Sequence, residues 1–301
     1  MCMVDYLDDR YELGAVLGEG AMGKVFAAFD KRLGIDVAVK IMNPELTRSK
    51  RHLARFSDEV KTCQRMCSPH VVKVVGIAVT RDEVPCMVTE LLEGESLEER
   101  LQREGGLSVA ETCEIIKQTA RALTRSHNLG VIHRDVKPGN IFLTKDEGGR
   151  LLVKLIDFGI ASTIAADGRY SSGDLAGTLE YMAPEVLLGT HEATTGVDVY
   201  SLAVVAFECL TGRGPVMGTF TEVLEQLKSG IVASLTEHRP DLEGAIDECV
   251  SRGLHPDPYW RFTTARDFAN AFERAATTRR LAAAAVADAA AAAEVTLPMA
   301  A

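Results

Sequence analysis

A run of eight residues near the middle of the chain holds several side chains that could do chemistry together: His133-Arg134-Asp135-Val136-Lys137-Pro138-Gly139-Asn140. Asp135 could accept the proton of a substrate hydroxyl, and Asn140 could offer an amide oxygen to a divalent cation. Lys137, two positions after Asp135, could supply positive charge to a phosphoryl group in transfer. These residue types at this spacing indicate phosphoryl transfer.

A second acidic motif, Asp157-Phe158-Gly159, follows the apolar run Leu151 to Ile156. We therefore expect Asp157 to end a strand and to face a cleft. A carboxylate there is suited to holding Mg²⁺ through oxygen.

The stretch from Gly18 to Val25 reads G-x-G-x-x-G-x-V and lies between two predicted strands. Glycines allow the backbone to approach phosphate oxygens closely. A dinucleotide-binding motif would need a helix opening at the third glycine, whereas this sequence continues as a strand. Taken alone, the motif is also compatible with a plain glycine hairpin.

Lys40 follows Val37-Ala38-Val39 inside a predicted strand whose neighbouring members are apolar. A lysine in a buried strand is costly unless an anion pairs with it. The expected anions are a nucleotide phosphate and Glu59, which lies in the helix predicted to follow. The alternative is a lysine whose ammonium group reaches solvent from an edge strand.

The elements that must position these residues fall into two parts. The first reads as five strands and one helix, and the second is mainly helical, with a hinge at Glu90 to Gly94. The predicted strands are Tyr11–Leu17, Lys24–Phe29, Asp36–Met42, Val71–Val79 and Pro85–Leu91. The predicted helices are His52–Met66, Val109–Ser126, Val197–Leu210, Thr219–Ser229, Leu242–Arg252 and Ala265–Ala275. After Ala276 the chain is Ala-rich, with too few large apolar groups to pack as a domain.

Composition excludes several classes of function. The 301 residues are 47% hydrophobic and carry a formal net charge of −10, which disfavours binding to nucleic acid or anionic membrane. The seven cysteines include no Cys-x-x-Cys pair and therefore fit free thiols in a reducing cytosol. Cys63 and Cys67 lie one helical turn apart, but no second pair of Cys or His residues follows at the spacing of a zinc site. The acidic N-terminus is unlike a secretory signal, and no apolar run reaches the ~20 residues of a membrane span. We expect a cytoplasmic protein.

The order of these motifs resembles the eukaryotic-type (Hanks-type) serine/threonine protein kinases, especially the bacterial members. The resemblance covers about residues 11 to 275 and includes Ala183-Pro184-Glu185, Asp198 and Arg261, which is similar to the arginine that pairs with that glutamate. It implies an α+β bilobal protein kinase fold. Residues 1–10 would be an N-terminal extension, 11–91 and 92–275 the two lobes, and 276–301 a tail.

The resemblance also implies a role for each matching residue. Lys40, paired with Glu59, would hold the α- and β-phosphates of ATP. Asp135 would orient and deprotonate the substrate hydroxyl, while Asn140 and Asp157 would bind Mg²⁺ or Mn²⁺.

The adenine site is implied in the same way. Thr89 would be the gatekeeper, the backbone of Glu90 and Leu92 would bond adenine, and Ala38 and Phe142 would sandwich the ring, although Phe142 could be ordinary core. The glycine-rich stretch would cover the nucleotide with Leu17, Gly18, Glu19, Gly20, Gly23 and Val25.

Substrate class and regulation follow from the same resemblance. Lys137, together with Gly177-Thr178 before Tyr181, looks like the serine/threonine group, so the partners would be proteins with acceptor serines or threonines. Arg134 would read a phosphate on the activation segment. Ser171 and Ser172 are the expected acceptors, with Thr163 and Thr178 as alternatives, and Thr178 could instead contact Asp135. A transient homodimer for autophosphorylation is left open.

Two other functions remain as alternatives: a pseudokinase, and a small-molecule kinase of the antibiotic phosphotransferase kind. The first is disfavoured by the full set of catalytic residues, and the second by the Ala183-Pro184-Glu185 segment with Arg261. Ala203, Cys63 and the pair Leu179-Glu180 depart from the usual family pattern, which leaves the peptide-docking preference open.

Overall fold

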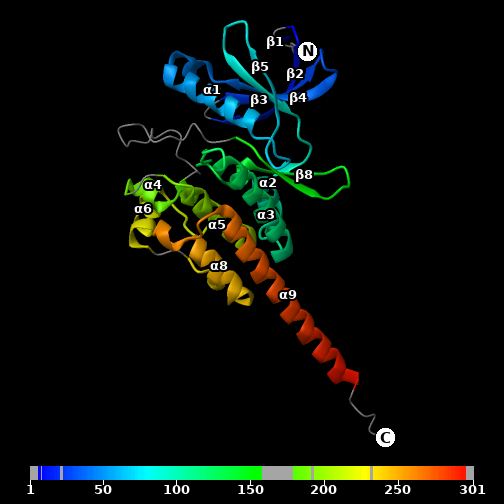
Figure 1. The fold of residues 1–301 in the computed structure, drawn as a ribbon, viewed down its shortest axis with the longest axis vertical. Helices are drawn as coiled ribbons and strands as arrows, with labels where there is room; N and C mark the ends of the chain where they lie inside the picture. Colours follow the sequence, from blue (N-terminus) through cyan, green and yellow to red (C-terminus); the bar gives the residue numbers. More distant parts are fainter. Residues whose placement is uncertain are drawn as a thin grey trace.

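The computed structural model describes residues 6–7, 9–20, 23–157, 179–190, 193–230 and 233–295, and within these ranges the side chains of residues 6, 51, 55, 58, 59, 62, 220 and 283–295 are not described. The N-terminal part is an antiparallel sheet with one helix, and the C-terminal part is mainly helical (Figure 1). This is the α+β fold with two parts that the sequence indicates.

The N-terminal sheet contains the five predicted strands and one more, in the order β1-β2-β3-β4-β6-β5. The bounds are β1 Tyr6–Leu7, β2 Tyr11–Gly20, β3 Gly23–Asp30, β4 Ile35–Met42, β5 Val74–Val79 and β6 Pro85–Glu90. Strand β1 adds two residues from the stretch expected to be an extension, because Leu7 pairs with Tyr11 across a tight turn. Leu7 is buried in the core of this sheet.

Strand β4 shows how the alternation of side chains builds both faces of the sheet. Val37 and Val39 are fully buried in one apolar cluster. Ala38 and Lys40 point to the opposite face, because successive side chains of a strand alternate. Their cross-strand partners include Thr89 for Ala38 and Val25 for Lys40, so these four residues share one face.

Helix α1, Lys50–Arg65, covers part of the sheet. Phe56 and Val60 lie on one side of the helix, four residues apart, and both are buried against Met42, Val84 and Met87. The helix therefore docks through a narrow apolar stripe.

The C-terminal part is built around α5, in which 13 of 16 residues are buried. Such a helix must be surrounded by others. The bounds of the helices are α2 Leu97–Glu104, α3 Val109–His127, α4 Pro184–Leu188, α5 Gly196–Thr211, α6 Phe220–Ser229, α7 Leu235–His238, α8 Ala245–Gly253 and α9 Ala265–Val295. A small sheet of β7 Glu95–Ser96, β8 Ile141–Lys145 and β9 Leu151–Leu155 lies between this bundle and the N-terminal part.

Close packing of α5 against α8 depends on a glycine. A Cβ built on Gly253 would lie 2.6 Å from the Cβ of Ala203, so no side chain fits at position 253. Ala203, which departs from the usual family pattern, is thus accommodated by Gly253.

Two of the boundaries that were predicted wrongly have local causes. The strand expected from Val71 begins at Val74, because Val71 and Val72 pair instead with Leu155 of β9. The helix expected from Leu242 begins at Ala245, because Leu242 ends a 3₁₀ turn and Gly244 has a φ of 96°.

Helix α9 continues well beyond the predicted end at Ala275 and projects away from the body of the molecule (Figure 1). Its buried side chains follow helical spacing at Ala265, Phe268, Phe272 and Ala275. No helix in the described part of the chain is long and apolar enough to cross a membrane.

Candidate active site

The loop from His133 to Lys137 is held by one buried carboxylate, that of Asp198 in the first turn of α5. Its Oδ2 accepts from the backbone N–H of His133 at 2.8 Å, and its Oδ1 accepts from that of Arg134 at 2.8 Å. His127 Nε2 donates to the same Oδ2 at 2.7 Å. The side chain of Asp198 is fully buried, so these bonds act without competition from water.

Arg134 adopts a left-handed backbone conformation, with a φ of 66°. Residues other than glycine rarely do so, and the conformation persists only where the surroundings enforce it. Here the enforcing contact is Asp198, which binds the N–H groups of both His133 and Arg134.

His133 is fully buried under this loop, and burial lowers the pKa of its imidazole. The ring is therefore neutral, and its Nδ1 can accept a hydrogen bond. The backbone N–H of Asp135 donates to that Nδ1 at 3.2 Å. His133 thus fixes the main chain at Asp135.

Asp135, Lys137 and Asn140 meet at one carboxylate oxygen. Asn140 Nδ2 donates to Asp135 Oδ2 and to the Asp135 carbonyl, both at 2.8 Å, and Lys137 Nζ lies 3.0 Å from Asp135 Oδ2. The double donation turns the amide so that Asn140 Oδ1 stays available as an acceptor.

Asp157 follows β9 and also has a left-handed backbone, with a φ of 49°. Its Oδ1 accepts from Lys40 Nζ at 2.7 Å, which links β4 to the end of β9. Burial opposes ionisation of Asp157, but the charge and hydrogen bond of Lys40 outweigh it, so the pKa of this carboxyl is lowered. The carboxylate is therefore ionised at neutral pH.

The residues expected around adenine come from both parts, with Ala38 in β4 and Phe142 in β8. Ala38 is buried, while Val25, Thr89, Leu92 and Phe142 are partly buried. Leu17 is 53% exposed at the outer edge.

The glycines of the hairpin between β2 and β3 differ in what they do. A Cβ on Gly23 would lie 2.0 Å from the carbonyl oxygen of Ile41, and the φ of Gly23 is 152°. At Gly18 and Gly20, in contrast, no atom lies within 4 Å of the position that a Cβ would take. The same is true of Gly34 in the next turn. Gly23 is therefore needed for strand packing, whereas the protein leaves open space beside Gly18 and Gly20. Glu19 is exposed and pairs with Lys24 at 3.0 Å.

The hinge is anchored by contacts that sequence reasoning missed. Glu90 Oε1 accepts from Lys154 Nζ of β9 at 2.6 Å and from the backbone N–H of Lys73 at 2.8 Å. A Cβ on Gly94 would lie 2.0 Å from the carbonyl oxygen of Leu143, so the chain after the hinge can pass over β8 only with a glycine.

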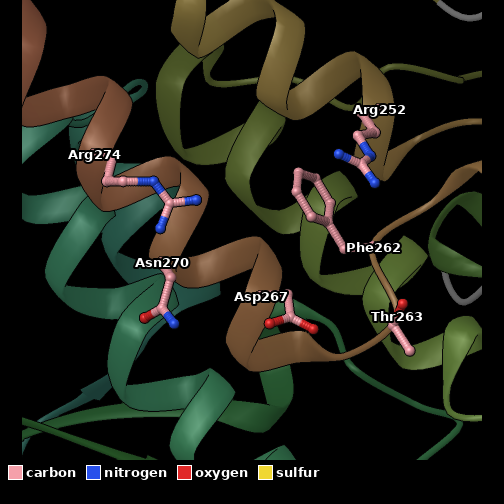
Figure 2. Close-up of a pocket in the computed structure, with 6 residues that line it drawn as sticks. All are labelled: Arg252, Phe262, Thr263, Asp267, Asn270 and Arg274. Carbon is pink, nitrogen blue, oxygen red and sulfur yellow. The ribbon is translucent and has the colours of Figure 1, made fainter.

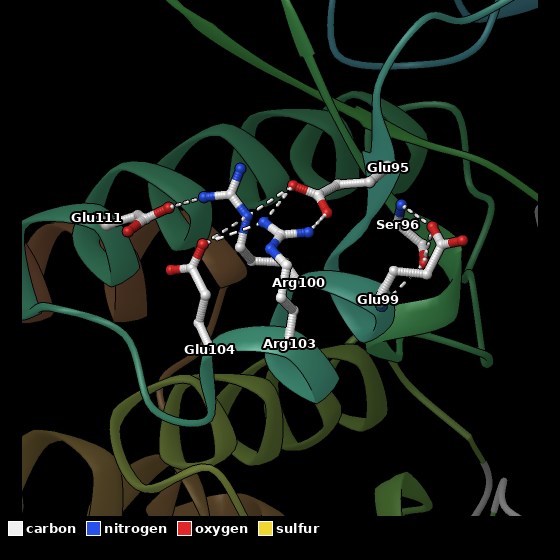
Figure 3. Close-up of polar contacts among 7 residues, drawn as sticks. All are labelled: Glu95, Ser96, Glu99, Arg100, Arg103, Glu104 and Glu111. Carbon is white, nitrogen blue, oxygen red and sulfur yellow. Dashed lines mark hydrogen bonds and ion pairs between the residues drawn. The ribbon is translucent and has the colours of Figure 1, made fainter.

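A polar network continues from the hinge into α2 (Figure 3). Arg100 Nε donates to Glu95 Oε1 at 2.6 Å, and its Nη1 donates to Glu111 Oε1 at 2.8 Å. Arg103 also binds Glu95 and Glu104. The hydrogen bonds from Arg103 and Arg100 lower the pKa of Glu95 to about 2. Ser96 and Glu99 form a capping box at the start of α2.

Arg261 and Glu185 form a bidentate pair in the interior. Their nitrogen–oxygen distances are 2.8 and 2.7 Å, and both residues are only 3% exposed. The Arg261 guanidinium also lies 4.9 Å from the centroid of the Tyr200 ring. This pair ties α4 to the chain between α8 and α9.

Several predicted residues lie outside the described part of the chain. They are Phe158, Gly159, Thr163, Ser171, Ser172 and Thr178, together with the side chain of Glu59.

The donor set fits a magnesium ion bound with a nucleotide. Within the described residues, no three His, Cys, Asp or Glu side chains converge as a metal cage. Mg²⁺ does not need one, because it is commonly held by one or two protein oxygens together with phosphate and water. Asn140 Oδ1 and the Asp157 carboxylate offer such oxygens.

Comparisons with known proteins agree with this geometry. The family model "Protein kinase domain" matches residues 11–273. Serine/threonine-protein kinase PknA of Mycobacterium tuberculosis is 35% identical over 271 residues, which cover 88% of this chain and 61% of PknA. PknB of Mycolicibacterium smegmatis is 35% identical, with coverage of 89% and 43%. The chain thus spans less than two thirds of these relatives.

Solved structures with the same fold were also found. The PknI kinase domain of Mycobacterium tuberculosis has a TM-score of 0.70 and 25% identity, with coverage of 91% of this chain and 99% of that one. Rad53 1–466 in complex with AMP-PNP has a TM-score of 0.70 and 28% identity, with coverage of 87% and 64%.

Proposed function

Because this chain belongs to the protein kinase family, we propose that it is an ATP-dependent serine/threonine protein kinase. It would transfer the γ-phosphate of ATP to serine or threonine hydroxyls of proteins. The observation that carries the proposal is the meeting of Asn140 and Lys137 at the Asp135 carboxylate, beside the Lys40–Asp157 pair. This set provides a base, positive charge and oxygen ligands in one place.

Asp135 would orient the substrate hydroxyl and accept its proton as the oxygen attacks the γ-phosphorus. A positioned base of this kind contributes about 10²- to 10⁴-fold to the rate. Lys137, already in contact with Asp135, would stabilise the charge on the transferred phosphoryl group. Asp198 serves this step indirectly, since it fixes the loop that carries both residues.

Lys40 would hold the α- and β-phosphates, with Glu59 as its partner in α1. Asn140 and Asp157 would hold Mg²⁺ or Mn²⁺, which when bound supplies charge neutralisation between the phosphates. The ionised state of Asp157 at neutral pH suits this role.

Adenine would lie between Ala38 and Phe142, with Thr89 as gatekeeper and the backbone of Glu90 and Leu92 as hydrogen-bonding groups. The support is that Ala38 and Thr89 are cross-strand partners on one face of the sheet. The outer wall would be formed by Leu17, Gly18, Glu19, Gly20, Gly23 and Val25.

Regulation would act through Arg134, whose guanidinium would bind a phosphate on the activation segment. We propose Ser171 or Ser172 as the autophosphorylated residue. Two copies of the chain would form a transient homodimer for this reaction, and the protein would act in the cytoplasm. Thr178 would contact the catalytic centre. The catalytic unit would be residues 11–275, with lobes 11–91 and 92–275.

Incubation of the full chain with γ-labelled ATP, Mg²⁺ and a generic acceptor protein tests the proposal. We expect label on serine and threonine of the acceptor, no transfer after chelation of the metal, and restoration by Mg²⁺ or Mn²⁺. Label confined to a small-molecule acceptor such as an aminoglycoside would contradict it.

A further inference from the structure

A cavity of about 260 Å³ opens on the C-terminal part, between the end of α8, the chain that follows Arg261, and α9 (Figure 2). It shares no residue with the catalytic loop or with the nucleotide site. It is lined by Arg252, Phe262, Thr263, Asp267, Asn270 and Arg274.

Two arginines give this cavity positive charge. The Arg252 guanidinium lies 4.3 Å from the centroid of the Phe262 ring, and its Nε donates to the Trp260 carbonyl at 3.4 Å. Arg274 follows Asn270 by one helical turn, on the side of α9 that faces the cavity (Figure 2). The one acidic residue of the lining, Asp267, accepts a hydrogen bond from Thr264 at 2.7 Å.

Neither guanidinium has a carboxylate partner among the described residues. Eight described arginines form ion pairs, but nine others besides Arg252 and Arg274 do not, so what sets these two apart is that both line one cavity. Two guanidinium groups at one cavity whose lining holds a single carboxylate favour the binding of an external anion.

Exposed aromatic residues stand beside the cavity. Tyr259 is 84% exposed and Trp260 is 67% exposed, and both directly precede Arg261 and Phe262 in the chain. Tryptophan, tyrosine and arginine are typical of the residues that dominate protein–protein interfaces, and Arg252 contacts the backbone of Trp260. The surface therefore offers an anion site with apolar contact area next to it.

We infer that this cavity is a docking site for a phosphorylated serine or threonine in a protein substrate. The guanidinium groups of Arg252 and Arg274 match the oxygens of a phosphate dianion, and the Asn270 amide and Thr263 hydroxyl add further donors. Tyr259 and Trp260 would contact the residues that flank the phosphate, which a free ion lacks. The inference rests on the proposed kinase function, since a phosphorylated serine or threonine is the product of that reaction. The cavity would retain protein substrates that already carry one phosphate.

Trp260 provides a direct readout, because it is the only tryptophan in the chain. The full chain, without ATP, is titrated with an alanine-rich peptide that contains one phosphothreonine, and tryptophan fluorescence is recorded. We expect a saturable change, and at least about tenfold weaker binding of the same peptide with unmodified threonine, because hydrogen bonds to a charged group are the stronger ones.

Variants distinguish binding at the cavity from nonspecific electrostatic attraction to the protein surface. Arg252→Gln and Arg274→Gln should each weaken binding of the phosphopeptide by about 10- to 100-fold. Arg266→Gln is the matched control, since Arg266 is exposed on the same helix but outside the cavity, and it should bind like the wild type. Thermal unfolding followed by circular dichroism checks that each variant is folded.

Equal affinities for all three variants, or equal binding of both peptides, would overturn the inference. So would inorganic phosphate that binds as tightly as the phosphopeptide, or a response to anionic phospholipid vesicles but not to the peptide. Because ATP is absent, a loss of phosphoryl transfer cannot cause any of these results, so failure of docking and failure of the proposed function remain distinguishable.

Discussion

At the scale of single residues, Asp198 shows how one buried carboxylate organises the catalytic loop. It accepts from two consecutive backbone N–H groups and from His127, and it holds Arg134 in a left-handed conformation. Such a residue touches neither the nucleotide nor the substrate in the proposed function, yet the position of Asp135 depends on it.

Replacement of Asp198 by asparagine tests this dependence. In this variant an amide NH₂ group replaces one carboxylate oxygen and cannot accept the hydrogen bond that this oxygen accepts. We therefore expect the free energy of unfolding to fall by about 3 kcal/mol and transfer activity to fall with it. Urea unfolding measures the first effect. Asp82→Asn, at an exposed turn position, serves as the control and should stay much closer to the wild type. Equal stability of the two variants would show that Asp198 does not hold the loop.

Sequence reasoning found the residues that belong to short motifs but missed those that act through distant contacts. Asp135, Lys137 and Asn140 lie within one stretch of six residues, so their proximity could be predicted from the sequence. His127 and Lys154 contact Asp198 and Glu90 across 71 and 64 residues, and no local pattern signals such pairs.

At the scale of elements, the hinge depends on the close passage of one segment over another. Gly94 has a φ of 143° and lies against β8, directly over the strand that carries Phe142. The conformation and the contact each exclude a side chain.

Gly94→Ala should therefore destabilise the protein more than a glycine replacement in open space. We expect a loss of roughly 3 kcal/mol in unfolding free energy, together with weaker ATP binding, because a Cβ must displace backbone. Gly34→Ala, where φ is 69° and nothing lies within 4 Å, should cost only about 1 kcal/mol from backbone strain. Urea unfolding and nucleotide titration compare the two. Equal losses would show that the contact with Leu143 is unimportant.

The network around Glu95 predicts a pH dependence of stability. Because the pKa of Glu95 falls from 4.5 to about 2 on folding, its ionised form contributes stability above pH 4.5, and this contribution is lost as the pH falls toward 2. Near neutral pH, Glu95→Gln should lower the free energy of unfolding by about 1 kcal/mol. The difference from the wild type should shrink below pH 4.5.

Urea unfolding at several pH values measures this difference. Glu147→Gln, in an exposed turn, is the control and should match the wild type throughout. A difference for Glu95→Gln that does not change with pH would contradict an ion-pair origin.

Hydrophobic periodicity predicted the element types well, because burial sets both the pattern and the packing. Predicted element boundaries were wrong where a tertiary contact or a backbone conformation outweighed the local sequence pattern. Val71 and Val72 have strand-forming side chains, but Leu155 accepts from the backbone N–H of Val72 and donates to the carbonyl of His70, which forms a bridge at Val71. Gly244, with a φ of 96°, breaks the helical geometry between Leu242 and the start of α8 at Ala245.

At the scale of the whole molecule, the two parts meet through the apolar packing of Cys63, Met66 and Val71 in the C-terminal core cluster and through polar contacts. Lys40 with Asp157 and Glu90 with Lys154 each join the N-terminal sheet to β9 or its end. The bilobal organisation could be predicted from the change in periodicity, whereas the cavity beneath α9 could not, because Arg252, Phe262 and Arg274 converge only after α8 and α9 pack together. The proposed active site and the proposed docking site share no residue.

The measurement that tests the central proposal most directly compares γ-phosphate transfer by the wild type, Asp135→Asn and Asp146→Asn. The account predicts that Asp135→Asn loses about 10²- to 10⁴-fold in rate, since the base is removed while the shape is kept. Asp146→Asn carries the same substitution in an exposed turn and should transfer at the wild-type rate. Equal labelling of the acceptor by all three proteins, or by none, would contradict the proposed function.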